Sequence, residues 1–120
     1  MSFDEMMKEL KQEYLEALPQ RILNLRQWIQ TGEVSLLINE FHKFKGTGTT
    51  YGLPEISELG STMERLLAEL EANEALVKSQ TGVDILEQIF SQRQRGFELN
   101  LEEHMGYKEL KESLAHDDEQ

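Results

Sequence analysis

Apolar residues recur three or four positions apart along almost the whole chain, a spacing that places them on one face of a helix. Phe3, Met7, Leu10, Tyr14 and Leu18 give the first example. Residues branched at Cβ never gather into the alternating runs that form strands. We therefore predict an all-α fold.

Turn signals divide the chain into a series of predicted helices and a polar tail. Pro19 either opens the second helix at its first position, where a missing N–H costs nothing, or kinks one longer helix; we favour a new helix. Glycines within residues 46–52 end the third helix. The predicted helices cover residues 3–18, 19–30, 33 to the glycine-rich stretch, 54–78, 83–101 and 107–114, and the tail covers 116–120. Short loops between them predict an antiparallel four-helix bundle with a short N-terminal helix and a short C-terminal helix.

Length and charge limit the classes of function. The 120 residues suffice for one domain, residues 1–120, with a modest core. A formal net charge of -11 argues against nucleic acid or an anionic membrane as a partner, because both are polyanions. The absence of cysteine excludes disulfides, thiol nucleophiles and thiolate metal sites. The acidic start and the lack of a long apolar run lead us to expect no signal peptide, no membrane span and a cytoplasmic location.

One segment of the third predicted helix carries side chains suited to chemistry. A helical wheel places His42 about 100° or more from the centre of the apolar arc, so its side chain is expected to be exposed. Ile38, Lys45 and Gly46 lie within about one turn of it on the same side. An exposed imidazole with an adjacent cation and an open approach suits a nucleophile that accepts a phosphoryl group from a second protein. Lys45 would then meet the developing phosphate charge.

Residues 42–53 resemble the signature of the histidine phosphotransfer (HPt) family, H-x-[hydrophobic]-K-G-[small]-[small]-x-x-[hydrophobic]-G-[hydrophobic]. Residues 14–19, Ile22 and residues 31–33 resemble the family's segment before this motif, and residues 59–60 and 63–67 resemble its next helix. The resemblance covers most of the first 70 residues. The departures from the family pattern are mild: Thr47 and Thr49 stand where Ala or Ser is commoner, and Phe41 stands where a small residue often precedes the histidine.

The resemblance implies a four-helix bundle in which His42 is the phosphoacceptor. The phosphoryl group would pass between His42 and an aspartate on a receiver domain, which supplies Mg²⁺ and most of the catalytic groups. Lys45 carries over as the residue that stabilises the phosphate. Glu64 stands where chemotaxis-type kinases carry Glu and many phosphorelay domains carry Gln. It would accept a hydrogen bond from Nδ1 and leave Nε2 facing the partner.

The same resemblance assigns a docking surface. Gly46 would provide clearance for the partner and Gly52 would be the turn glycine. Ile38 lies on the side of the helix that bears His42, and Lys43 is among the surface side chains in which pair specificity would reside. The cations Lys43 and Lys45, with Arg21 and Arg26, also outnumber the acids between residues 21 and 52, so this segment is locally cationic in an acidic protein.

The first hypothesis is therefore a phosphotransfer protein that serves a sensor histidine kinase and a response-regulator receiver domain. We expect a monomer without kinase activity or a cofactor of its own, because no nucleotide-binding motif is present. The alternative is a helical adaptor that docks a receiver or kinase without being phosphorylated. The starting Met1 and the polar C-terminus favour a free-standing protein over the N-terminal module of a larger chemotaxis-like kinase.

A metal site is not expected. A carboxylate-bridged metal pair in a helical bundle needs Glu three residues before His. Asn39, Leu101 and Ser113 occupy the positions three residues before His42, His104 and His116.

Overall fold

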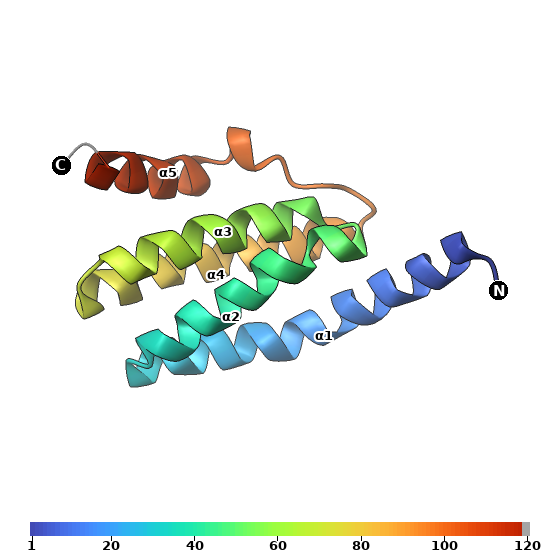
Figure 1. Cartoon of the computed structure of the whole chain (residues 1–120), viewed down its shortest axis with the longest axis horizontal. Helices are drawn as coiled ribbons and strands as arrows, with labels where there is room; N and C mark the ends of the chain where they lie inside the picture. Colours follow the sequence, from blue (N-terminus) through green and yellow to red (C-terminus); the bar gives the residue numbers. More distant parts are fainter. Residues whose placement is uncertain (119–120) are drawn as a thin grey trace.

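The computed structural model describes residues 1–118, with side chains as far as Leu114, and these residues form an all-α bundle (Figure 1). Residues 119–120 of the predicted polar tail, and the side chain of His116, lie outside the described part. The helices are α1 (Phe3–Thr31), α2 (Val34–Thr47), α3 (Pro54–Glu69), α4 (Ala72–Gln94) and α5 (Met105–Asp118), with short 3-10 helices η1 (Thr49–Tyr51) and η2 (Leu101–Glu103). Within the described chain, no helix is both long enough and apolar enough to span a membrane.

The first helix is continuous through Pro19, so the prediction of a separate short N-terminal helix is wrong. Pro19 is exposed, and the carbonyl that loses its helical partner there can bind water instead. Ser2 caps the start of α1 by accepting a hydrogen bond from the N–H of Glu5 at 3.2 Å. Gly32, at φ 74°, ends the helix in the left-handed conformation.

The third and fourth helices have boundaries that the sequence pattern misplaced. The predicted helix over 54–78 is broken at Leu70 and Glu71, whose backbones are extended. The predicted break at residues 79–82 does not occur, because Ser79 and Gly82 are buried inside α4. A Cβ at position 82 would lie 2.7 Å from the sulfur of Met63. Small residues here allow α3 and α4 to pack closely, which offsets their weaker helix propensity.

The fourth helix also ends earlier than predicted. It stops at Gln94, and Gly96 adopts φ 85°. Phe97, predicted on the inner face of a helix, is 58% exposed in the connection to α5. The predicted short C-terminal helix is present as α5 and begins two residues earlier than expected, at Met105.

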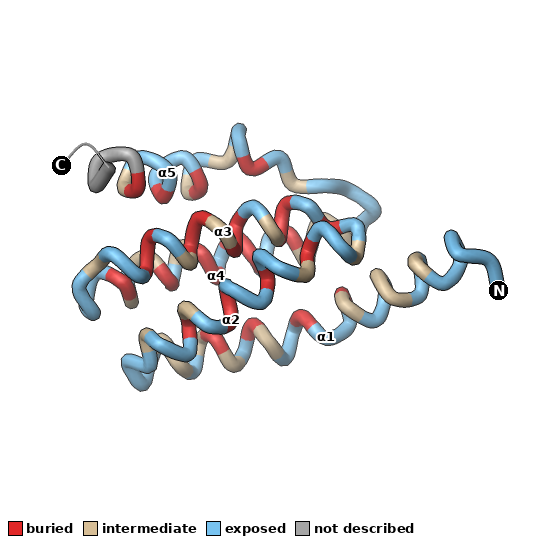
Figure 2. The backbone as a smooth tube through the Cα atoms, in the orientation of Figure 1, coloured by how far each residue is buried: buried red, intermediate tan, exposed pale blue. Residues whose placement is uncertain are grey.

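The core lies between α1, α2, α3 and α4 and continues onto η2 and α5; apart from the first turns of α1 and Phe97, it uses the faces that the helical spacing predicted to be inward. Figure 2 shows the buried residues on the sides of the helices that face one another. Leu18, Leu25, Leu37 and Phe41 are fully buried. The first turns of α1 extend beyond the bundle in Figure 1, and Phe3 there is 70% exposed. Packing against the other helices therefore begins only near the middle of α1.

The last helix packs along α3 on the side away from α2 (Figure 1). Its buried Tyr107 hydroxyl lies 2.8 Å from the hydroxyl of Thr62 and donates to Glu58 at 3.3 Å. The backbone N–H of Tyr107 donates to Nδ1 of His104 at 3.3 Å, while Nε2 of His104 lies 2.6 Å from Gln88. His104 thus acts as the N-terminal cap of α5 and connects it to α4.

The contact between Tyr107 and Thr62 leads to a prediction about alkaline stability. Burial is the main cause that raises the pKa of Tyr107 above 10.0. Because the pKa is higher in the folded state, the stability that the neutral Tyr107 hydroxyl contributes is complete below pH 10. It is lost as the pH rises through the folded-state pKa. Tyr107→Phe should cost about 1 kcal/mol near pH 8, because Thr62 loses a buried partner. In thermal melts from pH 8 to 11, the difference from wild type should shrink with rising pH; a constant difference would contradict the assignment.

Candidate functional site

The side chain of His42 projects from the outer side of α2 and is 63% exposed. Its helix is held by Leu37, Phe41 and Phe44, which are buried in the core on the opposite face. The spacing of these residues fixes the rotation of α2 and therefore turns position 42 outward. The neighbouring side chain of Glu64, on α3, is only 24% exposed.

The imidazole of His42 and the carboxylate of Glu64 form a hydrogen bond between two helices. Nδ1 of His42 lies 2.7 Å from Oε1 of Glu64. Because an ionised carboxylate only accepts hydrogen bonds, Nδ1 carries the proton in this pair. In the neutral ring, Nε2 then holds the free lone pair. The exposed imidazole thereby has a defined tautomer, and its unprotonated ring nitrogen is chemically able to act as a nucleophile.

Lys45 contributes a cation to the same cluster. Its Nζ lies 3.5 Å from Oε2 of Glu64, and its side chain is 49% exposed. Lys45 is three residues after His42, so both side chains reach α3 from neighbouring positions on α2. One carboxylate thus holds both the imidazole and the ammonium group, and a positive charge stands near the ring.

The surface around His42 is open on the side of Gly46. Gly46 is exposed, and a Cβ at its position would meet no atom within 4 Å. Lys43 is exposed as well, whereas Ile38 is half-buried and packs against the core. These residues surround His42 on α2, so a second protein could approach the imidazole from this face.

The predicted turn glycine lies at the end of the segment that follows the site. Gly52 adopts φ 78°, a conformation that favours glycine, immediately after η1. Its carbonyl accepts a hydrogen bond from Arg93 at 3.4 Å, and Arg93 also donates to Glu55 at 2.7 and 2.9 Å. The turn between α2 and α3 is therefore anchored to α4.

Polar contacts between α1 and α2 support the other flank. The hydroxyl of Tyr14 lies 2.8 Å from that of Thr47, which donates to the carbonyl of Lys43 at 2.8 Å. Burial is the main cause that raises the pKa of Tyr14. Arg21 donates to Glu40 at 2.7 Å through Nε. These contacts hold the helical turns on either side of His42 against α1.

Two structural contributions to the site were not predicted from the chain. Gly60 packs against the backbone of α2 beside His42. It lies four residues before Glu64, and this spacing was the only sequence feature that places it on the same helix face. Arg93 was not predicted to fix the turn at Gly52, and nothing in its local sequence distinguishes it from a solvated arginine.

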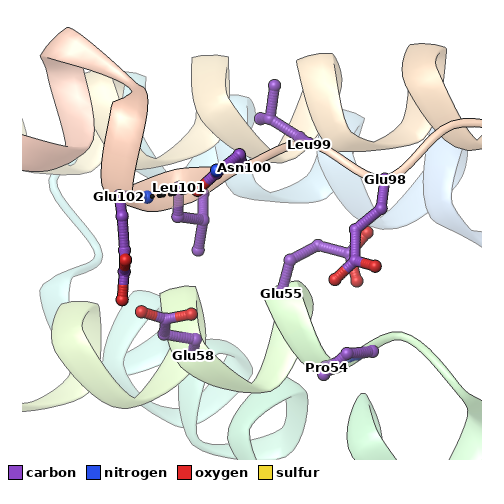
Figure 3. Close-up of a pocket in the computed structure, with 8 residues that line it drawn as sticks. All are labelled: Pro54, Glu55, Glu58, Glu98, Leu99, Asn100, Leu101 and Glu102. Atoms are coloured by element: carbon purple, nitrogen blue, oxygen red, sulfur yellow. Dashed lines mark hydrogen bonds between the residues drawn. The ribbon is translucent and has the colours of Figure 1, made fainter.

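A separate acidic depression of about 380 Å³ lies between the start of α3 and residues 98–102 (Figure 3). In Figure 3 the side chains of Glu58 and Glu102 extend toward one another across it. Glu55, at its edge, is already paired with Arg93. Among the described residues, no group of three or more His, Asp or Glu side chains is placed to hold a metal ion.

The arrangement defines a class of protein: a helical bundle that presents an exposed histidine paired with a carboxylate, which also contacts a lysine. The family model described as the Hpt domain matches residues 9–102, and the chain belongs to this family. Hpt domains are phosphoryl carriers of two-component signalling and generally interact with kinases and receiver domains. No curated protein and no solved structure gives a significant match. The fifth helix lies beyond the matched residues.

Proposed function

We propose that this protein is a histidine phosphotransfer protein in which His42 reversibly carries a phosphoryl group. The observation that carries the proposal is the 2.7 Å pairing of the exposed His42 imidazole with Glu64. This bond assigns the proton to Nδ1 and leaves Nε2 as the nucleophile. We also propose that α1 to α4 form an antiparallel four-helix core. The chain acts as a monomer in the cytoplasm.

The phosphoryl donor and acceptor is an aspartate on a response-regulator receiver domain, which supplies Mg²⁺. Nε2 of His42 attacks phosphorus, and a bond between nitrogen and phosphorus forms as the bond to the aspartate oxygen breaks. The aspartate leaves as a carboxylate. Nδ1 keeps its proton, and Glu64 balances the positive charge of the phosphorylated ring. The reverse reaction returns the group, and a sensor histidine kinase is the second partner.

The receiver is proposed to dock on the open face around His42. Ile38 and Lys43 flank the imidazole on α2, Gly46 leaves room for the partner's backbone, and Gly52 shapes the turn at the edge of this surface. The lysines complement a receiver's acidic phosphorylation site through charge. All catalytic groups other than His42, Lys45 and Glu64 come from the partner, so the chain has no kinase activity of its own.

The direct test is transfer from a receiver domain charged with radiolabelled acetyl phosphate. The chain should gain label that is stable in base and labile in acid, as expected of phosphohistidine. Stable binding of the charged receiver without acid-labile label would instead select the alternative, a helical adaptor that is not phosphorylated.

The proposed role of Lys45 gives a quantitative prediction. Lys45→Ala should slow transfer about tenfold, equivalent to about 1.4 kcal/mol, because the developing phosphate charge loses a nearby cation. Unfolding free energy should change by less than about 0.5 kcal/mol, because the side chain is half exposed. Transfer assays quenched at successive times measure the rate, and denaturation followed by circular dichroism measures the unfolding free energy.

Two variants control for the effect of charge. Lys45→Arg keeps the cation and should retain most of the rate. Lys108→Ala removes an exposed lysine from α5, on the other side of α3, and should leave the rate unchanged. An unchanged rate in Lys45→Ala would contradict the electrostatic role.

A further inference from the structure

We infer that Gly60 is a positioning residue that sets the distance between the imidazole of His42 and the carboxylate of Glu64. The inference rests on the proposed function for its consequence in phosphotransfer, but its structural content stands on the contact between α2 and α3. Gly60 is buried on α3, one turn before Glu64. Residues four apart share a helix face, so both point toward α2.

The space beside Gly60 is filled by backbone, which cannot yield. A Cβ at this position would lie 2.6 Å from the backbone nitrogen of Lys45 and 2.7 Å from the carbonyl oxygen of Phe41. These two atoms belong to the same turn of α2, because an α-helix joins each N–H to the carbonyl four residues earlier. His42 projects from this turn. Gly60 therefore allows α3 to touch the segment that bears the phosphoacceptor.

The size of the effect follows from the distances. An ordinary Cβ contact begins at 3.4 Å, so moving from 2.6 to 3.4 Å separates the helices locally by about 0.8 Å. The bond from Nδ1 of His42 to Glu64 is 2.7 Å long and would then approach 3.5 Å. Hydrogen bonds of this type weaken beyond about 3.2 Å. One added methyl group should therefore break the bond that fixes the tautomer, and Lys45 should move with it.

Gly82 provides a matched control on the neighbouring helix. It is also a buried helical glycine, but a Cβ there would meet the sulfur and terminal methyl group of Met63, at 2.7 and 2.8 Å. These atoms are the far end of a flexible side chain and can rotate away. Gly82→Ala should therefore affect stability without changing the distance between His42 and Glu64.

The test compares Gly60→Ala and Gly82→Ala by ¹⁵N nuclear magnetic resonance of the histidine ring and by transfer from a phosphorylated receiver. In wild type and Gly82→Ala, the nitrogen shifts should show the proton on Nδ1 of His42. In Gly60→Ala, the proton should redistribute toward Nε2 and the transfer rate should fall at least tenfold. A wild-type tautomer and rate in a folded Gly60→Ala variant would overturn the inference.

A second variant covers the case in which Gly60→Ala does not fold. Glu64→Asp shortens the carboxylate side chain by one methylene on a partly exposed residue and leaves the helix contact intact. It should produce the same redistribution of the proton. If His42 keeps the wild-type tautomer in Glu64→Asp, its hydrogen bond tolerates a change in the distance to the carboxylate, and the inference is wrong. A wild-type protein that gives the expected spectra but takes no phosphoryl group would refute the proposed function alone.

Discussion

Replacing His42 by glutamine is expected to abolish acid-labile labelling of the chain by a phosphorylated receiver, to below about 0.1% of the wild-type rate. Glutamine can keep a hydrogen bond to Glu64 but offers no nucleophilic nitrogen. The imidazole is 63% exposed, so the change should alter unfolding free energy by less than about 0.5 kcal/mol. Time courses of label transfer, with thermal melts of both proteins, measure the two effects.

The control for this loss is His104→Gln. The imidazole of His104 is engaged with Gln88 and with the backbone N–H of Tyr107, and it lies at the start of α5. Its replacement should reduce stability by about 1 kcal/mol through loss of the helix cap, with transfer unchanged. Equal labelling of His42→Gln and wild type would show that another residue carries the phosphoryl group.

Among the single substitutions proposed for this protein, removal of the Arg93 guanidinium is expected to cause the largest loss of folding stability. The carboxylate of Glu55 is almost fully buried, and Arg93 donates to both of its oxygens. Arg93→Met keeps an aliphatic side chain but leaves this charge without its partner, which should cost about 3 kcal/mol. For a chain of this size the melting temperature should fall by roughly 10 °C. Chemical and thermal denaturation at neutral pH provide the measurement.

The double variant Arg93→Met with Glu55→Gln separates loss of the ion pair from general disruption. Removal of the second charge should recover more than half of the loss, because position 55 then holds no buried charge without a partner. The turn at Gly52 also loses its hydrogen bond from Arg93, and that part should persist in the double variant. If the single and double variants are equally unstable, the buried charge is not the cause.

The outward direction of His42 could be predicted because it follows from a local rule. The apolar residues of α2 recur at helical spacing, so the rotation of the helix, and with it the exposure of position 42, can be deduced without any knowledge of its neighbours. Lys45 and Gly46 follow from the same rotation. The residue on α3 that pairs with His42 does not follow from this rotation, and the prediction of Glu64 rests on family resemblance alone.

The errors in helix boundaries have one physical origin. Packing between helices that are distant in the sequence determines where a helix ends when local propensity does not. Pro19 stays within a helix whose neighbouring residues Leu18 and Ile22 are buried in the core, and Gly82 stays within one because Met63 fills the adjacent space. Leu70 and Glu71 end a helix without any residue that disfavours one. The spacing of Gly60 from Glu64 indicates only a shared helix face; its close contact depends on the backbone of another helix and could not be predicted from the sequence.

The pairing of α1 with α4 bears on the order in which the chain folds. Arg26 reaches Asp84, 58 positions away, whereas the largest helix contact joins the sequence neighbours α2 and α3. Loop closure costs more entropy as the closed segment lengthens, so contacts between neighbours form at lower cost. We expect the hairpin of α2 and α3 to form early and the closure of α1 on α4 to come later. His42 and the carboxylate of Glu64 would then meet before the bundle is complete.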